Sequence, residues 1–418
     1  MCDRSENKSF VGYSYSSLLP RYSSLHANMI DKTRATDLLM RFLAIEGITG
    51  QEKNIAREIQ NTLKQAGVKQ IRYDDANSRI PVRTQTGNLL AFLPGTIPGP
   101  RIMFMTHMDT VPLCAKAVPV KKGNKIVPQG VTALGGDNRT GCAVLVNLVA
   151  TLLDHKLPHP PITLLFTVRE ESGLFGARHI DPTVLQGPAM GFNFDGRSAA
   201  DITIGAVGAD RWEVDIEGKA SHAGVYPERG ISASMIAALA MADIFRGGWF
   251  GKVVKDGREG TSNIGSIGDA NGKSAGEATN VVTDSVHIKG ESRSHDPKFF
   301  REITNAYKAA FADACGQVTD HEGKTGKVKF TSRTDYHPFR IKDDAPVVQR
   351  AIEAVKGIGR EPRTKVTNGG LDANWMVKHG IPTVTFGAGQ NDIHTVKEWV
   401  DVPEFLEGCK LAVELAKG

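Results

Sequence analysis

The order of apolar and polar positions predicts strands and helices that alternate through the first half of the chain. Apolar residues recur at helical spacing in two early segments, Thr36–Leu43 and Ile55–Gln65. Continuous apolar runs of strand length follow at Asn88–Leu93, Arg101–Thr106 and Ile162–Val168. A long apolar helix, Cys142–Leu153, is predicted between the last two runs. This alternation favours an α/β fold with a mostly parallel sheet covered by helices on both faces.

The pattern changes near Gly205, where strands begin to alternate apolar and polar residues as half-exposed strands do. The predicted strands lie at Arg211–Glu217, near Ile264, at Val281–Ile288 and at Val328–Ser332. The predicted helices are Ser232–Phe245 and Pro297–Ala314. The resulting order, β-α-β-β-α-β, is typical of a ferredoxin-like α+β sheet with two helices on one face.

Helix–strand alternation resumes near Asp343 and continues to the C-terminus. The predicted elements there are helix Pro346–Lys356, strand Pro382–Phe386 and helix Pro403–Ala416. We therefore expect an α/β domain formed by residues 31–208 and 340–418, interrupted by an inserted α+β domain at residues 209–339. Residues 1–30 are Ser- and Tyr-rich and lack the apolar centre of a secretory signal, so we expect a flexible N-terminal extension.

Composition narrows the classes of partner. The 418 residues are 40% hydrophobic and 23% charged, which is ordinary for a globular protein of two domains. The net charge is +5, but Lys and Arg are scattered, so we expect no nucleic-acid partner. No apolar run reaches the roughly 20 residues that span a bilayer, so no membrane partner is expected. Five widely spaced cysteines without a C-x-x-C motif indicate reduced thiols and a cytoplasmic location.

Residues able to bind a metal follow most of the predicted core strands. His107 and Asp109 lie two apart, so on an extended chain their side chains point to the same side. A ligating histidine usually donates its second ring N–H to a carboxylate, which fixes the imidazole tautomer. His107 as a ligand with Asp109 as its orienting partner fits that need, although H-x-D alone is a weak signal.

Four further acids and a histidine extend the pattern. Asp137 follows two glycines and precedes a helix, so it could be an N-cap or a carboxylate that bridges two cations. The pair Glu170–Glu171 ends one apolar strand, Asp195 ends another, and His394 follows the last core strand. Each is more often structural than catalytic when taken alone. Together, imidazoles and carboxylates on successive strand ends are the ligand types of catalytic zinc.

Two other readings remain open at this point. Gly272-Lys273-Ser274-Ala275-Gly276 matches the G-x-S-x-G motif of serine hydrolases, which requires a strand before it and a helix after it. The surrounding Gly/Ala/Asn-rich segment predicts neither, so a chance match is favoured. A metal-binding or peptide-binding module without catalysis is also possible, but Glu170, which need not bind metal, argues against it.

The motifs together resemble the aminoacylase/carboxypeptidase-like family of di-zinc metallopeptidases, and within it the peptidase T-like, or tripeptidase-like, branch. The segments that carry the resemblance are His107-Met108-Asp109, Gly136-Asp137-Asn138, Arg169-Glu170-Glu171-Ser172-Gly173, Phe194-Asp195-Gly196, Ser221-His222-Ala223-Gly224, Gly369-Gly370-Leu371-Asp372-Ala373-Asn374 and Ile393-His394-Thr395. The resemblance extends from about Asp31 to the C-terminus. Two positions depart from the pattern: Asn138 stands where Asp is common, and the segment after His222 looks more like the deacylase and carboxypeptidase branches.

The resemblance implies a role for each matched residue. His107 and Asp195 would bind one zinc, Glu171 and His394 the other, and Asp137 would bridge them. Asp109 would orient His107, and Glu170 would be the general base. In the inserted domain, which the resemblance identifies as a lid and dimerisation domain, three residues would act on the substrate: His222 on the tetrahedral intermediate, and Asn280 and Arg293 on the substrate carboxylate.

The expected activity is that of a zinc-dependent exopeptidase that hydrolyses short peptides through a bridging hydroxide on two zinc ions, with cobalt or manganese as possible substitutes. An N-acyl amino acid deacylase or glutamate-carboxypeptidase-like amidohydrolase is the alternative within the family. The expected substrate is thus a short peptide or an N-acyl amino acid. A homodimer through the inserted domain is expected, because its exposed sheet edge can pair with a second copy. Whether His222 serves its own chain or a partner chain stays open.

Overall fold

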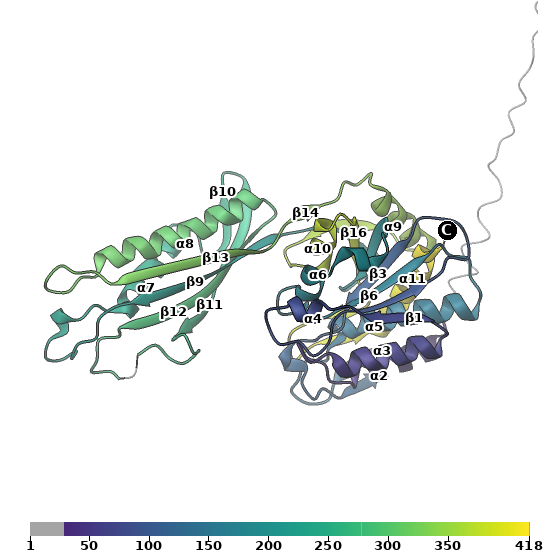
Figure 1. The fold of residues 1–418 in the computed structure, drawn as a ribbon, viewed down its shortest axis with the longest axis horizontal. Coiled ribbons are helices and arrows are strands. Elements are labelled where there is room, and N and C mark those ends of the chain that lie inside the picture. The colour runs from purple at the N-terminus through teal and green to yellow at the C-terminus, as the bar shows by residue number, and fades with distance from the viewer. Residues whose placement is uncertain (1–28, 277, 418) are drawn as a thin grey trace, which may run out of the picture.

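The computed structural model of the chain describes residues 29–276 and 278–417, which form a larger and a smaller body (Figure 1). Residues 1–28 of the predicted N-terminal extension lie outside the described residues, and Ile30 is buried in the core of the larger body. Within the described residues, no helix combines the length and apolar character needed to cross a membrane.

The larger body contains a nine-stranded sheet. Its strands are β1 (Gln70–Tyr73), β2 (Leu89–Leu93), β3 (Ile102–His107), β6 (Ile162–Thr167), β7 (Met190–Phe194), β8 (Asp201–Ala206), β14 (Phe339–Arg340), β15 (Arg363–Thr367) and β16 (Thr383–Phe386). They are arranged in the order β1-β2-β6-β3-β7-β16-β8-β14, and β15 pairs with β8. The four central strands, β6, β3, β7 and β16, are parallel to one another, so their carboxyl ends meet at one edge of the sheet.

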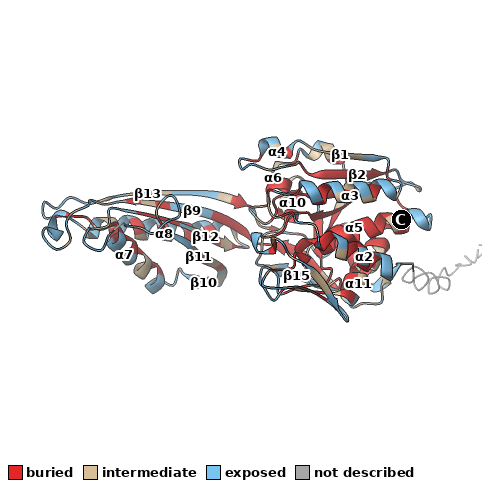
Figure 2. Cartoon of the chain, turned by 90° about the horizontal axis from the view of Figure 1, so that it is seen from below, coloured by how far each residue is buried: buried red, intermediate tan, exposed pale blue. Residues whose placement is uncertain are grey.

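Helices cover both faces of this sheet (Figure 2). The helices of the larger body are α2 (Lys32–Leu43), α3 (Lys53–Gln65), α4 (Ala76–Arg79), α5 (Gly136–Asp154), α6 (Phe175–His179), α9 (Pro346–Gly357), α10 (Asp372–Lys378) and α11 (Val402–Ala416). Residues of α2, α3, α5, α9 and α11 form one core cluster with the sheet, and residues of α6 and α10 join the cluster on the opposite face. The predicted α/β class, a mostly parallel sheet flanked by helices, is confirmed.

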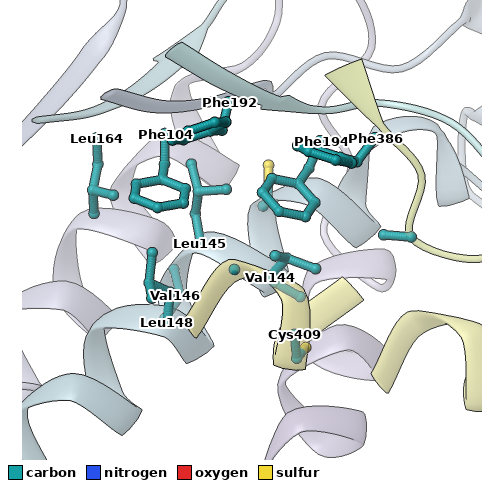
Figure 3. Packing of buried hydrophobic residues seen from close by; sticks show 14 of the residues in the cluster. Phe104, Val144, Leu145, Val146, Leu148, Leu164, Phe192, Phe194, Phe386 and Cys409 are labelled. Carbon is teal, nitrogen blue, oxygen red and sulfur yellow. The ribbon is translucent and has the colours of Figure 1, made fainter. Parts of the chain in front are cut away.

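An aromatic layer fills the space between the central strands and α5 (Figure 3). The rings of Phe104 and Phe192 lie 5.5 Å apart between centroids, and those of Phe194 and Phe386 lie 5.7 Å apart. All four side chains are essentially inaccessible, so each strand contributes the large apolar burial that dominates core stability. The polar residues at the ends of these strands are therefore fixed to a rigid support.

The smaller body is the inserted segment between β8 and β14, and it has its own sheet and core. Its elements are β9 (Gly208–Glu217), α7 (Ala233–Arg246), β10 (Gly251–Lys255), β11 (Arg258–Gly268), β12 (Ser285–Ser294), α8 (Pro297–Gln317) and β13 (Lys327–Tyr336). The five strands follow the antiparallel order β10-β11-β12-β9-β13, and α7 and α8 pack together on one face (Figure 1).

This inserted sheet has one strand more than the predicted β-α-β-β-α-β order. The extra strand, β10, forms a hairpin with β11 through Asp256 and Gly257, whose φ angles are 51° and 73°. Two consecutive positive φ values are those of a type I′ turn, for which Asp-Gly is a preferred pair. The ferredoxin-like prediction therefore needs this one correction.

The core of the inserted domain is centred on Trp212 of β9, which is 1% exposed. Its indole lies against Tyr307 and Phe330 at centroid distances of 4.6 and 5.7 Å. Gly290 stands opposite Trp212 in the register of β12 and β9, where a Cβ would come within 2.1 Å of the indole ring. Glycine is required at this position because a side chain there would displace the tryptophan.

A third, four-stranded sheet attaches the C-terminal loops to the segment before α5. Its strands are β4 (Pro119–Lys122), β5 (Lys125–Pro128), β17 (Gln390–Asn391) and β18 (Trp399–Asp401), in the order β17-β18-β5-β4. The pairing of β18 with β5 brings the loop that contains His394 close to the start of α5, where Asp137 lies.

Two predicted elements differ from the structure in their bounds. Helix α5 begins at Gly136 rather than Cys142, although Asp137 and Asn138 within it have non-helical backbone angles. Strand β12 begins at Ser285 rather than Val281 and runs to Ser294. Val281 makes an isolated bridge with His222, and residues 282–284 between that bridge and β12 have no strand pairing.

Candidate metal centre

A pocket of about 520 Å³ opens at the carboxyl ends of the central strands. Its lining includes the six candidate metal-site residues from the strand ends of the larger body: His107, Asp137, Glu170, Glu171, Asp195 and His394. The inserted domain contributes Arg211, Arg293 and Tyr336 to the wall that faces them. Strands β3, β6 and β7 end at His107, Thr167 and Phe194. Because these strands are parallel, the loops that follow them lie at the same edge of the sheet.

Asp137 lies between the two histidines. Its Oδ1 is 3.1 Å from His107 Nε2, and its Oδ2 is 3.2 Å from His394 Nε2. Asp195 Oδ1 lies 3.9 Å from His107 Nε2, and Glu171 Oε1 lies 2.9 Å from His394 Nε2. The five residues therefore form two groups of possible ligands, His107–Asp137–Asp195 and Asp137–Glu171–His394, which share Asp137.

Asp109 holds both His107 and the loop that carries the two glutamates. The Nδ1 atom of His107 is 3.1 Å from the Asp109 carbonyl oxygen and 3.3 Å from Asp109 Oδ1, which leaves Nε2 directed at Asp137 and Asp195. The same carboxylate accepts the backbone N–H groups of Glu170 at 3.0 Å and Glu171 at 3.2 Å. Asp109 is fully buried, so these bonds are protected from competing water.

The carboxylates of the cluster repel one another. Burial raises the pKa of Glu170 and of Asp195 well above the usual range, and neighbouring acid charges add to the effect. Burial and the charge of Asp137 raise the pKa of Glu171 to about 7. No Lys or Arg within the described residues forms an ion pair with any of these carboxylates. The positive charge that the cluster requires must therefore come from protons or from bound cations.

The neighbouring carboxylates favour the protonated form of both histidines. Hydrogen bonds with Asp137 and Glu171 raise the pKa of His394 to about 10. Burial would lower the pKa of His107, but the charge of Glu170 and hydrogen bonds with Asp109 and Asp137 more than offset it. Hydrogen bonds from both imidazoles in turn hold the pKa of Asp137 below its usual range, although burial opposes this. Imidazole and carboxylate donors that share one acid fit a pair of divalent cations.

Two buried acids that sequence reasoning missed also support the site. Glu398 accepts the backbone N–H groups of Leu134, Gly135 and Asp137, so it holds the turn that presents the shared carboxylate. Asp372, at the start of α10, is hydrogen-bonded to Thr167 Oγ1 at the end of β6, and burial raises its pKa to about 7. Neither acid stands in a ligand-like motif, although Asp372 lies within the Gly369–Asn374 segment that carries part of the resemblance.

The three predicted substrate residues of the inserted domain fall into two places. Arg293 lines the pocket, because it lies opposite Ala209 near the start of β9. His222 and Asn280 are not among the lining residues. They lie together beyond the other end of β9, where Ala223 N–H bonds to the Asn280 carbonyl at 2.9 Å. The ten residues of β9 span about 30 Å, so this conformation keeps His222 far from its own chain's metal ligands.

Ser274 lies in an exposed loop, and the described residues between it and β12 form no helix. The G-x-S-x-G match therefore lacks the strand–turn–helix context of a nucleophile elbow. The serine-hydrolase reading is not supported by the structure.

Comparison with known proteins identifies the family. The pattern of Peptidase family M20/M25/M40 matches residues 103–418. The uncharacterized protein YqjE of Bacillus subtilis (strain 168) is 30% identical over 388 residues, which cover 93% of this chain and 98% of that protein.

Two solved structures are similar over nearly their whole length. Aminopeptidase PepT from Bacillus cereus ATCC 10987 is 31% identical with a TM-score of 0.79, covering 93% of this chain and 99% of that one. A tripeptidase from Staphylococcus aureus subsp. aureus Mu50 is 28% identical with a TM-score of 0.83 and the same coverage. The chain therefore belongs to peptidase family M20/M25/M40 and is a metallopeptidase of its peptidase T-like branch.

Proposed function

We propose that this protein is an exopeptidase that removes a residue from short peptides with the help of two divalent cations, with zinc as the preferred metal. The observation that carries the proposal is the position of Asp137, whose two oxygens face different histidines at 3.1 and 3.2 Å. The similarity to an aminopeptidase and a tripeptidase supports a peptide with a free N-terminus as substrate.

His107, Asp137 and Asp195 would hold one cation, and Asp137, Glu171 and His394 the other. When bound, two such cations activate water and polarise the scissile carbonyl group. Glu170 belongs to neither ligand group, yet it lines the pocket and is buried. It is therefore the group that would take the proton from the attacking water and return it to the leaving amine.

Arg293 would bind the C-terminal carboxylate of the peptide. A planar guanidinium suits bidentate binding of a carboxylate, and Arg293 is one of the residues through which the inserted domain reaches the pocket. In the structure Arg293 pairs with Glu291 at 2.9 Å, so a substrate carboxylate would have to compete with that acid. Binding at this position would hold the scissile bond at a fixed distance from the metal ligands, and short peptides would be preferred.

His222 and Asn280 would act in the site of a second copy. Both lie at the end of the inserted domain remote from the pocket of their own chain, and they lie beside each other. In a symmetric dimer the same surface of each subunit reaches the other, so each site would receive one such pair. His222 would then stabilise the oxyanion that develops on the carbonyl.

A screen of metal-loaded enzyme tests the function. We expect turnover of dipeptides or tripeptides with free termini, loss of turnover after chelation, and recovery on addition of zinc. Turnover of N-acyl amino acids without turnover of free peptides would favour the deacylase alternative. The absence of hydrolysis in both substrate sets, with metal bound, would contradict the proposal.

A further inference from the structure

Glu52 is a buried carboxylate outside the pocket. It is 0% exposed and occupies the N-cap position of α3, yet its side chain makes no capping hydrogen bond. Its Oε1 instead accepts the backbone N–H groups of Gly50 at 2.7 Å and Arg169 at 3.1 Å. N-cap side chains normally bond to the first turn of their own helix. Glu52 is turned away from its helix and toward the loop that follows β6.

That loop presents four consecutive backbone N–H groups to side-chain oxygens from other segments. The bonds are Val168 to Asn88 Oδ1 (3.1 Å), Arg169 to Glu52 Oε1 (3.1 Å), Glu170 to Asp109 Oδ1 (3.0 Å) and Glu171 to Asp109 Oδ2 (3.2 Å). Asn88, Glu52 and Asp109 are each fully buried. The orientation of the two glutamates is therefore determined by a continuous row of bonds, in which Glu52 holds the residue just before Glu170.

Arg169 has a backbone conformation that needs support from its surroundings. Its φ is 53°, in the left-handed region that non-glycine residues seldom adopt. Such a conformation persists where surrounding contacts over-determine it. The Glu52 bond fixes the Arg169 N–H, and the guanidinium is held at Thr84 Oγ1 (2.7 Å) and the Arg83 carbonyl (2.6 Å).

The segment that carries Glu52 is itself tied to both loops of the metal centre. Thr49 N–H bonds to the Thr110 carbonyl at 2.9 Å, in the loop after His107. Thr49 Oγ1 lies 2.9 Å from Ser172 Oγ, in the loop that carries Glu170. A Cβ at Gly50, where φ is 87°, would come within 2.3 Å of the Arg169 guanidinium. Residues 49–52 therefore form a clamp between the two loops.

We propose that Glu52 is a positioning residue, which fixes the direction of the Glu170 carboxylate by holding the Arg169 N–H. Glu52 does not line the pocket, so it acts through the loop and not on the substrate. The inference rests on the proposed function, since it assigns Glu52 a role through the general base. Burial and the charge of Asp109 raise the pKa of Glu52 to about 7, so glutamine is a close replacement for its acid form.

The test compares E52A with E52Q. Removal of the acceptor in E52A is expected to lower kcat about 10–100-fold, as loss of supporting groups around metal sites typically does, with KM and metal content near those of the wild type. E52Q keeps an oxygen at the same reach and should restore most of kcat. Asp31→Ala is the matched control, because Asp31 caps α2 by accepting Arg34 N–H at 3.0 Å and does not touch the loop. It should leave kcat unchanged.

Hydrogen exchange in metal-free protein gives a readout that does not depend on activity. E52A should speed amide exchange in the peptide covering residues 168–173, whereas E52Q and Asp31→Ala should not. If E52A does not fold, E52D replaces it. Its shorter side chain places the carboxylate oxygen farther from the Arg169 N–H, so it should also lower kcat and speed exchange in residues 168–173. Wild-type kcat and unchanged exchange in the folded variant would overturn the inference. An inactive wild-type enzyme with the expected exchange pattern would instead contradict the proposed function.

Discussion

Asp137 Oδ2 lies 3.2 Å from His394 Nε2, although the inserted domain separates the two residues along the chain. This contact and the Glu171 contact raise the pKa of His394 from 6.5 to about 10 in the absence of metal. The folded state then binds the proton more tightly than the unfolded state. The resulting stabilisation is fully present below about 6.5 and is lost as the pH rises through about 10.

We therefore expect the free energy of unfolding of metal-free wild type to exceed that of His394→Asn at pH 6.5, and the excess to shrink toward pH 10. Urea denaturation of both proteins across this range is the measurement. The variant serves as the control for other groups that titrate near pH 10. A difference that stays constant across the range would contradict the protonated state of His394.

Asp137→Asn should reduce metal content more than Asp195→Asn does. Asp137 belongs to both groups of possible ligands, whereas Asp195 belongs to one. The amide also cannot offer two anionic oxygens to two cations. Metal analysis after gel filtration measures the content per chain, and equal metal content in the two variants would count against a shared carboxylate.

Glu170→Gln should bind metal normally and lose about 10²–10⁴-fold in kcat, the usual contribution of a general acid–base group. The reason is that Glu170 lines the pocket without belonging to either ligand group. The neighbouring Glu171→Gln is the contrast, because Glu171 lies 2.9 Å from His394 and should lose metal. Substantial activity in Glu170→Gln would remove this residue from the mechanism.

Two inactive variants should restore activity when mixed. His222→Ala disables the partner's site if His222 acts across a dimer, and Glu170→Gln disables its own site. A mixed dimer then contains one site with both groups intact, formed by Glu170 of one chain and His222 of the other. Subunits are exchanged by mild denaturation and refolding, and activity is measured against each variant refolded alone. Full activity of His222→Ala alone, or no recovery in verified mixed dimers, would exclude this arrangement.

Asn138→Asp should destabilise the protein by about 1–3 kcal/mol, because it replaces a buried donor with an acceptor. The Asn138 amide donates to the Phe194 carbonyl at 2.8 Å, while its oxygen accepts the Gly141 N–H at 3.0 Å. The same oxygen accepts the side-chain amide of Gln390 at 2.9 Å, so three bonds determine the orientation of the Asn138 amide. Urea denaturation should show the loss near neutral pH and a partial recovery in acid, where the new side chain can donate again. Unchanged stability at both pH values would contradict this bonding pattern.

The central sheet and its metal-competent strand ends could be predicted because local pattern and tertiary position coincide there. In a parallel sheet buried on both faces the strands are largely apolar, and a polar residue such as His107 or Asp195 stands at the end of a strand or directly after it. Strand β15, Arg363–Thr367, could not be found in this way, since it is largely exposed and polar. Strand β10 was not predicted, although the Asp256–Gly257 pair that follows it is a typical sequence for a hairpin turn.

The supporting acids could not be predicted from local pattern. Glu398 acts on backbone groups more than 260 positions away, and Glu52 acts on Arg169 from a helix start that resembles an ordinary cap. Their roles depend on contacts between segments that are distant along the chain, and no local sequence pattern indicates those contacts. The position of His222 could not be predicted for a related reason. No local pattern indicates at which end of the inserted domain its loop lies relative to the metal ligands.

The inserted domain separates His394 from the other four possible ligands, which all precede Gly208. During synthesis, four possible ligands emerge from the ribosome before the inserted domain: His107, Asp137, Glu171 and Asp195. The last one, His394, emerges after the inserted domain. A chain that stops early, or is cut within the insertion and loses its C-terminal part, retains one ligand group but not the second. The second ligand group can therefore form only after translation has passed the inserted domain and reached His394. Truncated products that lack His394 lack this group.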